Sequence, residues 1–209
     1  MKKEKKDVII LGSGGLAREF ANYFSEYINI IGFLTKNPED FTKYNLSGDL
    51  FSSLITIENS PSKNLVIAIG SPKVKRSLYS EFKKKGFSFP TLKHPSSIIS
   101  ESASLGEGVI ISPFSIIGPN VDIGNCVYIN YQVGVGHDSN IGSFTQINPG
   151  AQIGGSTFIK GDTLVGSNAI ILQNTKIEKN IKIGSGAIVL GKKMKEGTIA
   201  PSFSKYLPF

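Results

Sequence analysis

The C-terminal half of the chain carries an aliphatic residue at every sixth position. The residue four places after each of them is almost always small or β-branched, as at Val109, Ser115 and Ala151. Each hexapeptide therefore predicts a short strand followed by a turn, and three of them predict one triangular coil of a parallel β-helix. The aliphatic series comprises Ile99, Leu105, Ile111, Ile117, Ile123, Ile129, Val135, Ile141, Ile147, Ile153, Ile159, Val165, Ile171, Ile177, Ile183 and Val189.

Many of these aliphatic residues are followed directly by glycine, as at Gly106, Gly118 and Gly124, or by asparagine, as at Asn130. Glycine and asparagine tolerate left-handed backbone better than other residues do. We therefore expect the residue after each aliphatic position to turn the corner of the coil in that conformation.

The period also predicts which residues are neighbours between coils. Residues 18 apart should stack, which places His137 beneath Gly155 and Gly155 beneath Gln173. His137 should project from a corner, beside Asp138 and under a bare glycine amide, an arrangement that can pair a base with an oxyanion donor. A surface histidine without a chemical role is the alternative.

The N-terminal half begins with a predicted buried strand, Val8–Leu11, followed by Gly12-Ser13-Gly14-Gly15 and an amphipathic helix. The apolar face of that helix comprises Leu16, Phe20, Tyr23, Phe24 and Tyr27. Glycines at a helix N-terminus let the backbone turn tightly, and the free N–H groups with the helix dipole attract phosphate. The pattern therefore predicts a phosphate-binding turn, with a purely structural tight turn as the alternative.

Two more strands, Asn29–Leu34 and Leu65–Ile69, complete a predicted βαβ-type sheet. The last strand leads through Gly70 to Ser71 and Pro72, which are typical of the N-cap and the first turn of a helix. This part of the chain is expected to form a small α/β, Rossmann-like domain.

The series Gly12-x-Gly14-x-x-Ala17 also satisfies the dinucleotide fingerprint, so an NAD-dependent enzyme has to be considered. That fingerprint requires an acidic residue after the second strand to bind the ribose, and this chain has Thr35 and Lys36 there. A mononucleotide or a nucleotide-sugar fits the pattern better.

The formal net charge of +7 suggests anionic partners. Residues 1–98 hold 15 Lys and Arg against 9 Asp and Glu, so +6 of that charge lies in the N-terminal half. Basic residues interleaved with aromatic ones, which nucleic-acid binding usually requires, are lacking, so we expect no nucleic-acid partner. No run approaches the roughly 18 apolar residues of a membrane span, and we expect a cytoplasmic protein.

Cysteine and histidine are scarce. The lone Cys126 cannot form an intramolecular disulfide and is expected to be a small buried hydrophobe. A zinc site with three histidine ligands is excluded because the chain has only His94 and His137, so no metal is expected.

Four motifs together carry a resemblance to a known family. They are Gly12-x-Gly14-Gly15, Ala68-Ile-Gly70 followed by Arg76, His94-Pro95-Ser96, and Gly136-His137-Asp138 within the hexapeptides. Over essentially its whole length the chain resembles the bacterial sialic acid O-acetyltransferase (NeuD/PglD-like) family, which includes N-acetyltransferases of nucleotide-linked 4-amino-sugars. The resemblance implies a nucleotide-sugar-binding domain over residues 1–93 and a left-handed β-helix over residues 94–209.

The resemblance also implies roles for individual residues. His137 would be the general base, polarised by Asp138, and the backbone N–H of Gly155 would contact the acetyl carbonyl. The nucleotide-sugar would bind Gly12, Ser13, Gly14, Gly15, Leu16, Thr35, Lys36, Gly70 and Ser71. Acetyl-CoA would contact Gln146, Gly155, Gly166, Ser167 and Ser185, in a groove between two subunits of a homotrimer. Lys192, Lys193 and Lys195 would meet its phosphates or remain ordinary solvated lysines.

The chain departs from the family pattern in three places. Many members have a second histidine where this chain has Gln146, and an aspartate where it has Thr35-Lys36. The usual Gly-x-Pro-Ala-Lys ending appears here as Ile199-Ala-Pro-Ser-Phe203. The first departure affects the contact with bound acetyl-CoA, and the second affects the recognition of the nucleotide base. The third affects the adenine contacts.

Three functions are consistent with the sequence. The first is an acetyl-CoA-dependent N-acetyltransferase that acts on a UDP- or GDP-linked amino-sugar in bacterial glycan or polysaccharide biosynthesis. The second is O-acetylation of a sialic acid or a related sugar hydroxyl. The third is a non-catalytic sugar-nucleotide-binding protein that kept the fold.

Overall fold

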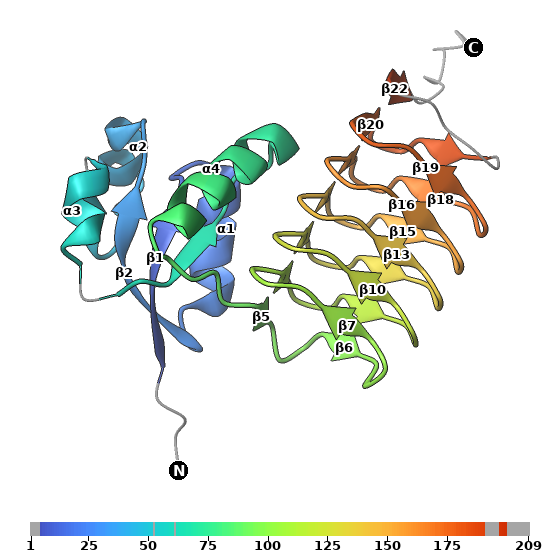
Figure 1. Ribbon diagram of the computed structural model, residues 1–209, viewed down its shortest axis with the longest axis horizontal. Helices are drawn as coiled ribbons and strands as arrows, with labels where there is room; N and C mark the ends of the chain where they lie inside the picture. Colours follow the sequence, from blue (N-terminus) through green and yellow to red (C-terminus); the bar gives the residue numbers. More distant parts are fainter. Residues whose placement is uncertain (1–4, 52, 61, 191–196, 200–209) are drawn as a thin grey trace, which may run out of the picture.

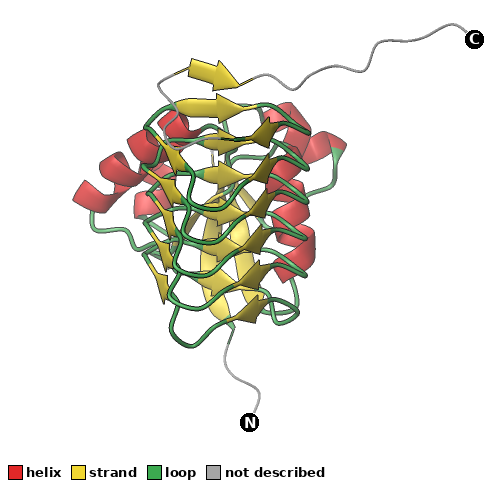
Figure 2. Cartoon of the chain, turned by 90° about the vertical axis from the view of Figure 1, so that its right-hand side faces the viewer, coloured by secondary structure: helices red, strands yellow, loops and turns green. Residues whose placement is uncertain are grey.

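The computed structural model describes residues 5–51, 53–60, 62–190 and 197–199. A small α/β domain is joined to a prism of stacked coils, as both views show (Figures 1 and 2). Lys192, Lys193, Lys195 and the segment 200–203 lie outside the described residues, so their expected contacts stay predictions. Within the described part, no helix combines the length and apolarity that crossing a membrane requires.

The N-terminal domain is a parallel sheet with strand order β3-β2-β1-β4. Its elements are β1 (Lys6–Leu11), α1 (Gly15–Phe24), β2 (Ile28–Leu34), α2 (Pro38–Lys43), β3 (Asp49–Phe51), α3 (Leu54–Glu58), β4 (Leu65–Ile67) and α4 (Pro72–Lys84). The three expected strands are present, although β4 ends at Ile67 and not at Ile69 as expected. The short elements α2, β3 and α3 were not predicted, and Tyr27 lies beyond the end of α1 and is 43% exposed.

Alternating residues of β1 pack on opposite faces of this sheet, because successive side chains of a strand point in opposite directions. Val8 and Ile10 pack with Phe20 of α1, whereas Ile9 and Leu11 pack with Phe82 of α4. Helices therefore cover both faces, and the domain is Rossmann-like, as expected.

The remaining strands form a left-handed parallel β-helix, which confirms the expected fold. Nearly all contain two residues and recur every six residues (Figure 1). They are β5 (Leu92–Lys93), β6 (Ile98–Ile99), β7 (Ser104–Leu105), β8 (Ile110–Ile111), β9 (Ile116–Ile117), β10 (Asp122–Ile123), β11 (Tyr128–Ile129), β12 (Gly134–Val135), β13 (Asn140–Ile141), β14 (Gln146–Ile147), β15 (Gln152–Ile153), β16 (Phe158–Ile159), β17 (Leu164–Val165), β18 (Ile170–Ile171), β19 (Lys176–Ile177), β20 (Ile181–Ile183), β21 (Ile188–Val189) and β22 (Gly197–Ile199).

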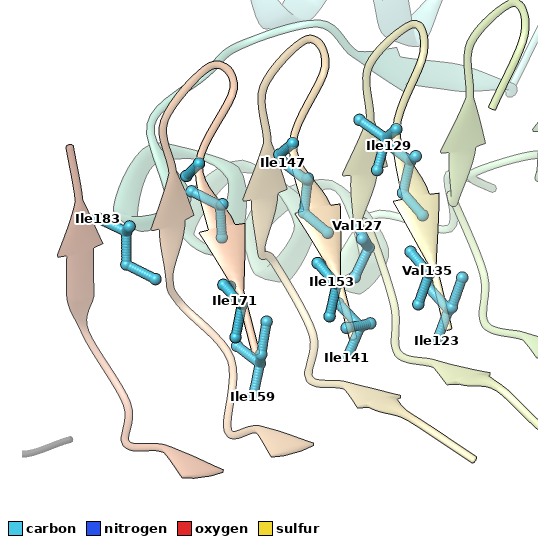
Figure 3. Close-up of a cluster of buried hydrophobic side chains, with 14 of the residues drawn as sticks. Ile123, Val127, Ile129, Val135, Ile141, Ile147, Ile153, Ile159, Ile171 and Ile183 are labelled. Carbon is cyan, nitrogen blue, oxygen red and sulfur yellow. The ribbon is translucent and has the colours of Figure 1, made fainter. Parts of the chain in front are cut away.

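The β-helix has three faces, each a parallel sheet. The first, with order β22-β20-β17-β14-β11-β8-β5, is called the domain face because it packs against the N-terminal domain. The second, β21-β18-β15-β12-β9-β6, is called the apolar face, and the third, β19-β16-β13-β10-β7, the polar face. The predicted aliphatic series points inward from all three faces and forms the core (Figure 3).

The expected position of the left-handed backbone is wrong. From Leu105 to Ile183, positive φ occurs three residues after each aliphatic position, for example at Asn120 (φ 56°), Cys126 (φ 52°) and Asp138 (φ 58°). Glycine is required directly after the aliphatic residues for a different reason, because the next coil approaches closely there. A Cβ at Gly136 would lie 2.5 Å from the backbone nitrogen of Gly155, a distance that no real side chain could occupy.

Helix α4 fixes the two domains to each other. Arg76 forms a bidentate ion pair with Asp162, whose side chain is only 6% exposed, and Tyr79 donates a hydrogen bond to Glu107. Tyr128 of the domain face is buried against the core of the N-terminal domain. The two domains are therefore joined by both apolar and charged contacts.

Candidate active site

His137 lies at the corner between the apolar face and the polar face, and its side chain is 64% exposed. Its Nδ1 lies 2.8 Å from Oδ2 of Asp138. Because an ionised carboxylate can only accept hydrogen bonds, Nδ1 carries the proton and Nε2 keeps a free lone pair. The imidazole is therefore oriented as a base.

Asp138 is held in turn by Asn120, which donates a hydrogen bond from Nδ2 to Oδ1 over 3.0 Å. The hydrogen bonds from Asn120 and then from His137 lower the pKa of Asp138 below its usual range. The carboxylate therefore stays ionised beside the imidazole. Asn120 was not predicted, although it lies 18 residues before Asp138 and the stacking rule could have found it.

Gly155 lies directly above His137, as the period predicted. Ser156 donates a backbone hydrogen bond to the carbonyl of His137 over 2.8 Å, which fixes the stacking of the two coils. A Cβ at position 155 would lie 2.7 Å from Nε2 of His137. Among the described residues, the backbone N–H of Gly155 has no hydrogen-bond partner, so it can donate to a bound oxygen next to the base.

The glycine turn after β1 lies at the carboxyl edge of the N-terminal sheet, where ligands bind in open α/β sheets. Gly12 has φ 110°, and a Cβ at Gly14 would meet no atom within 4 Å. The expected N-terminus of α1 at Gly15 is confirmed, and no side chain caps it. Backbone N–H groups at this end of the helix are therefore open to an anion.

The end of β4 lies beside this turn because β4 pairs directly with β1. Gly70 has open space where a side chain would be, and Ser71 caps α4 through its hydroxyl, which accepts a hydrogen bond from the N–H of Val74. The structure thus brings Gly70 and Ser71 next to Gly12–Gly15 at one edge of the sheet.

Residues from the end of β2 complete this edge. The hydroxyl of the buried Ser13 lies 2.7 Å from that of Thr35, and it donates to the carbonyl of Asn37. Ser13 and Thr35 therefore stabilise the loop, while Lys36 is exposed and Leu16 is half-buried at the start of α1.

The residues expected to contact acetyl-CoA fall on different parts of the β-helix. Gly166, Ser167 and Ser185 stack at the corner between the domain face and the apolar face, where Gly186 donates a backbone hydrogen bond to Ser167. His137 and Gly155 lie at the opposite edge of the apolar face. Within one chain the structure does not bring these two sets together.

Gln146 lies on the domain face and is buried. Its Oε1 accepts a hydrogen bond from Nζ of Lys75 over 3.1 Å. Within one chain its side chain is therefore part of the interdomain contact and not adjacent to His137. The described residues contain no group of three or more His, Cys, Asp or Glu side chains that could hold a metal ion.

The N-terminal domain is similar to a known family of protein domains. Residues 7–82 match the PglD N-terminal domain family. The matched segment runs from β1 into α4 and includes the glycine turn and Gly70-Ser71. A comparison with curated protein sequences found no match.

Solved structures match almost the whole chain. The acetyltransferase domain of PglB from Neisseria gonorrhoeae is 23% identical, with a TM-score of 0.82 over 97% of this chain and 100% of that one. A His-to-Ala variant of GDP-perosamine N-acetyl transferase from Caulobacter crescentus, in complex with CoA and GDP-perosamine, is 22% identical, with a TM-score of 0.78 over 88% of each chain. WeeI from Acinetobacter baumannii is 23% identical, with a TM-score of 0.75 over 93% of this chain and 94% of that one. At these identities the matches establish a shared fold.

Proposed function

We propose that the protein is an acetyl-CoA-dependent N-acetyltransferase whose acceptor is the amine of a nucleotide-linked amino-sugar. One observation carries this proposal. Nε2 of His137 is oriented as a base against Gly155, and the backbone N–H of Gly155 has no hydrogen-bond partner among the described residues. Two structural relatives support the choice of substrates, since one was solved with acetyl coenzyme A and another with CoA and GDP-perosamine.

The chain's residues would act as follows. Acetyl-CoA supplies an acetyl thioester. Nε2 of His137 accepts a proton from the sugar amine as the nitrogen attacks the thioester carbon, so that a C–N bond forms and the C–S bond breaks. The N–H of Gly155 donates to the carbonyl oxygen, where negative charge develops. The protonated His137 then returns its proton to the departing sulfur, which leaves as the free thiol of CoA.

Asp138 keeps the imidazole in the productive tautomer and stabilises it when it becomes protonated. The nucleotide would bind at the glycine turn, with its phosphates at the N-terminus of α1 and beside Gly70 and Ser71. An amine acceptor needs only one base and no covalent intermediate, which suits a site with a single histidine.

We also propose that the working form is a homotrimer built on the apolar face. Of the other two faces, the domain face packs against the N-terminal domain at Leu92, Ile110 and Tyr128, and the polar face carries a hydrogen-bonded ladder of Ser104, Asp122 and Asn140. The apolar face instead exposes four isoleucines in one stacked column, two on each side of Gly134 and Gln152. Their exposed fractions are 65% for Ile98, 53% for Ile116, 40% for Ile170 and 61% for Ile188.

A trimer on this face also explains why the expected site residues lie at two separate corners. The corner with His137 and Gly155 and the corner with Gly166 and Ser167 border the same apolar face. When two prisms pack side by side, one corner of each can line a shared groove. The base would then come from one subunit and the coenzyme contacts at Gly166, Ser167 and Ser185 from its neighbour.

The test is an acceptor comparison. The protein is incubated with acetyl-CoA and, separately, a UDP-linked amino-sugar, a GDP-linked amino-sugar and a sialic acid, and both free CoA and acceptor mass are measured. The proposal predicts thiol release and acetylation with an amino-sugar nucleotide. Acetylation of the sialic acid alone would favour O-acetylation, and nucleotide binding without thiol release would favour a non-catalytic binding protein.

A further inference from the structure

Helix α4 buries a lysine in its contact with the β-helix. Lys75 is 1% exposed, and its Nζ donates to the backbone carbonyl of Thr145 and to Oε1 of Gln146, each over 3.1 Å. Among the described residues no carboxylate forms an ion pair with it. Both of its partners are neutral oxygens.

This contact decides how the Gln146 amide is oriented. An ammonium group can only donate hydrogen bonds, so Gln146 must turn its oxygen toward Lys75 and its nitrogen away. The nitrogen, Nε2, donates in turn to Oδ1 of Asn148 over 3.2 Å. The oxygen of Asn148 is therefore engaged with Gln146, and its Nδ2 is left as a donor that points away from Gln146.

Asn148 is half-buried at the corner between the domain face and the apolar face. It lies directly beneath Gly166, because Ile147 pairs with Val165 in the ladder and Asn148 donates its backbone N–H to Val165. Its Nδ2 has no hydrogen-bond partner among the described residues. A fixed, neutral donor at a half-buried corner suits a neutral carbonyl oxygen better than a charged group.

We propose that Asn148 is a binding residue for the acyl donor, with its Nδ2 donating to an amide carbonyl of the pantetheine chain of CoA, and that Lys75 is a positioning residue that acts on Asn148 through Gln146. This inference rests on the proposed function, because it assigns a further contact to the same coenzyme groove. It also gives Gln146 a role that does not require direct contact with the acetyl group.

The decisive variant is Gln146→Glu. A glutamate carboxylate still accepts from Lys75, but it cannot donate, so Asn148 must turn its nitrogen inward and present its oxygen to the groove. Isothermal titration with CoA, at about pH 6 so that the Lys75 amine is protonated, should give a Kd raised about tenfold. The melting temperature should not fall, because the new carboxylate pairs with the buried ammonium group.

Two further variants complete the experiment. Asn148→Asp, which replaces the donor with an acceptor, should raise the Kd for CoA by a similar factor. Asn140→Ala removes an asparagine side chain from the polar face and should leave the Kd unchanged. If Gln146→Glu does not fold, Asn148→Ala decides the matter, and it should also weaken CoA binding.

The outcomes separate this inference from the proposed function. If the wild-type protein binds CoA and both Gln146→Glu and Asn148→Asp bind it equally tightly, the role of Asn148 is wrong while the proposed function stands. If the wild-type protein binds no CoA, both are wrong. A purely structural Lys75–Gln146 contact predicts changes in melting temperature without changes in Kd.

Discussion

Nε2 of His137 lies against the α-carbon of Gly155, so closely that a Cβ at position 155 would be 2.7 Å away from it. Gly155 thus provides the room that the imidazole occupies, and its N–H has no hydrogen-bond partner among the described residues. The two residues are 18 positions apart in the sequence and stack because three hexapeptides make one coil.

This relationship predicts that Gly155→Ala is a catalytic defect in a folded protein. The new methyl group must displace the imidazole, and a misplacement of about 1 Å can cost about 10²-fold in rate. We expect kcat to fall by that order while the melting temperature and CoA affinity change little. If the Gly155→Ala protein kept the kcat of the wild type, the assigned geometry would be contradicted.

Asp138→Asn should slow acetyl transfer by about 10²-fold, because an amide no longer specifies which nitrogen of His137 carries the proton. Since the side chain of Asp138 is exposed, unfolding measurements should show little change in stability. Steady-state kinetics under saturating acetyl-CoA measure the effect. An unchanged kcat would mean that Asp138 does not orient the base.

Asn120→Ala tests the residue behind Asp138. The hydrogen bond from Asn120 is the main cause of the lowered pKa of Asp138, so its removal should move that pKa up toward its ordinary value. An NMR titration of the Asp138 carboxyl group should therefore show protonation at a higher pH in the variant. An identical titration in both proteins would rule out this contact in solution.

Lys75→Met should change how stability depends on pH. Burial lowers the pKa of Lys75 to about 7 from an ordinary value of 10.5. Between these values the unfolded chain binds more protons than the folded one, so stability rises with pH through this window and levels off below it. Chemical denaturation should show wild-type stability increasing from neutral pH to mildly alkaline pH relative to the methionine variant. Parallel curves for the two proteins would show that Lys75 is not buried as described.

The apolar face supplies a test of assembly. Ile116→Asp and Ile170→Asp place charges in the isoleucine column and should convert a trimer into a monomer of 22.5 kDa, measured by light scattering. Lys176→Asp on the polar face is the matched control and should leave the mass unchanged. A wild-type protein that is already monomeric would contradict the trimer.

The β-helix could be predicted from the sequence almost residue by residue, because its period fixes both the inward residues and the stacking of coils. Ile141 and Ile159 are buried as predicted, and His137 lies under Gly155. The role of the corner glycines could not be read in the same way. Glycine is required at these corners because the next coil approaches closely, as at Gly136, and not because the backbone is left-handed there.

The contacts between the domains had no sequence signal. Lys75 is one of many lysines in the chain, and nothing in its neighbours indicates that α4 buries it against Gln146. Such pairing depends on how two independently patterned domains pack together. For the same reason the hydrogen bonds of Gln146 to Lys75 and Asn148 had no sequence signal, and only the family resemblance suggested a role for Gln146, as a coenzyme contact.

We propose His137 as the general base of an acetyl transfer to a sugar amine. The most direct test is the rate of CoA release from acetyl-CoA with a nucleotide-linked amino-sugar, compared between the wild-type protein and His137→Ala. The rate in the variant should be lower by about 10²–10⁴-fold, with CoA affinity retained. A variant that releases CoA at the wild-type rate would contradict the proposal.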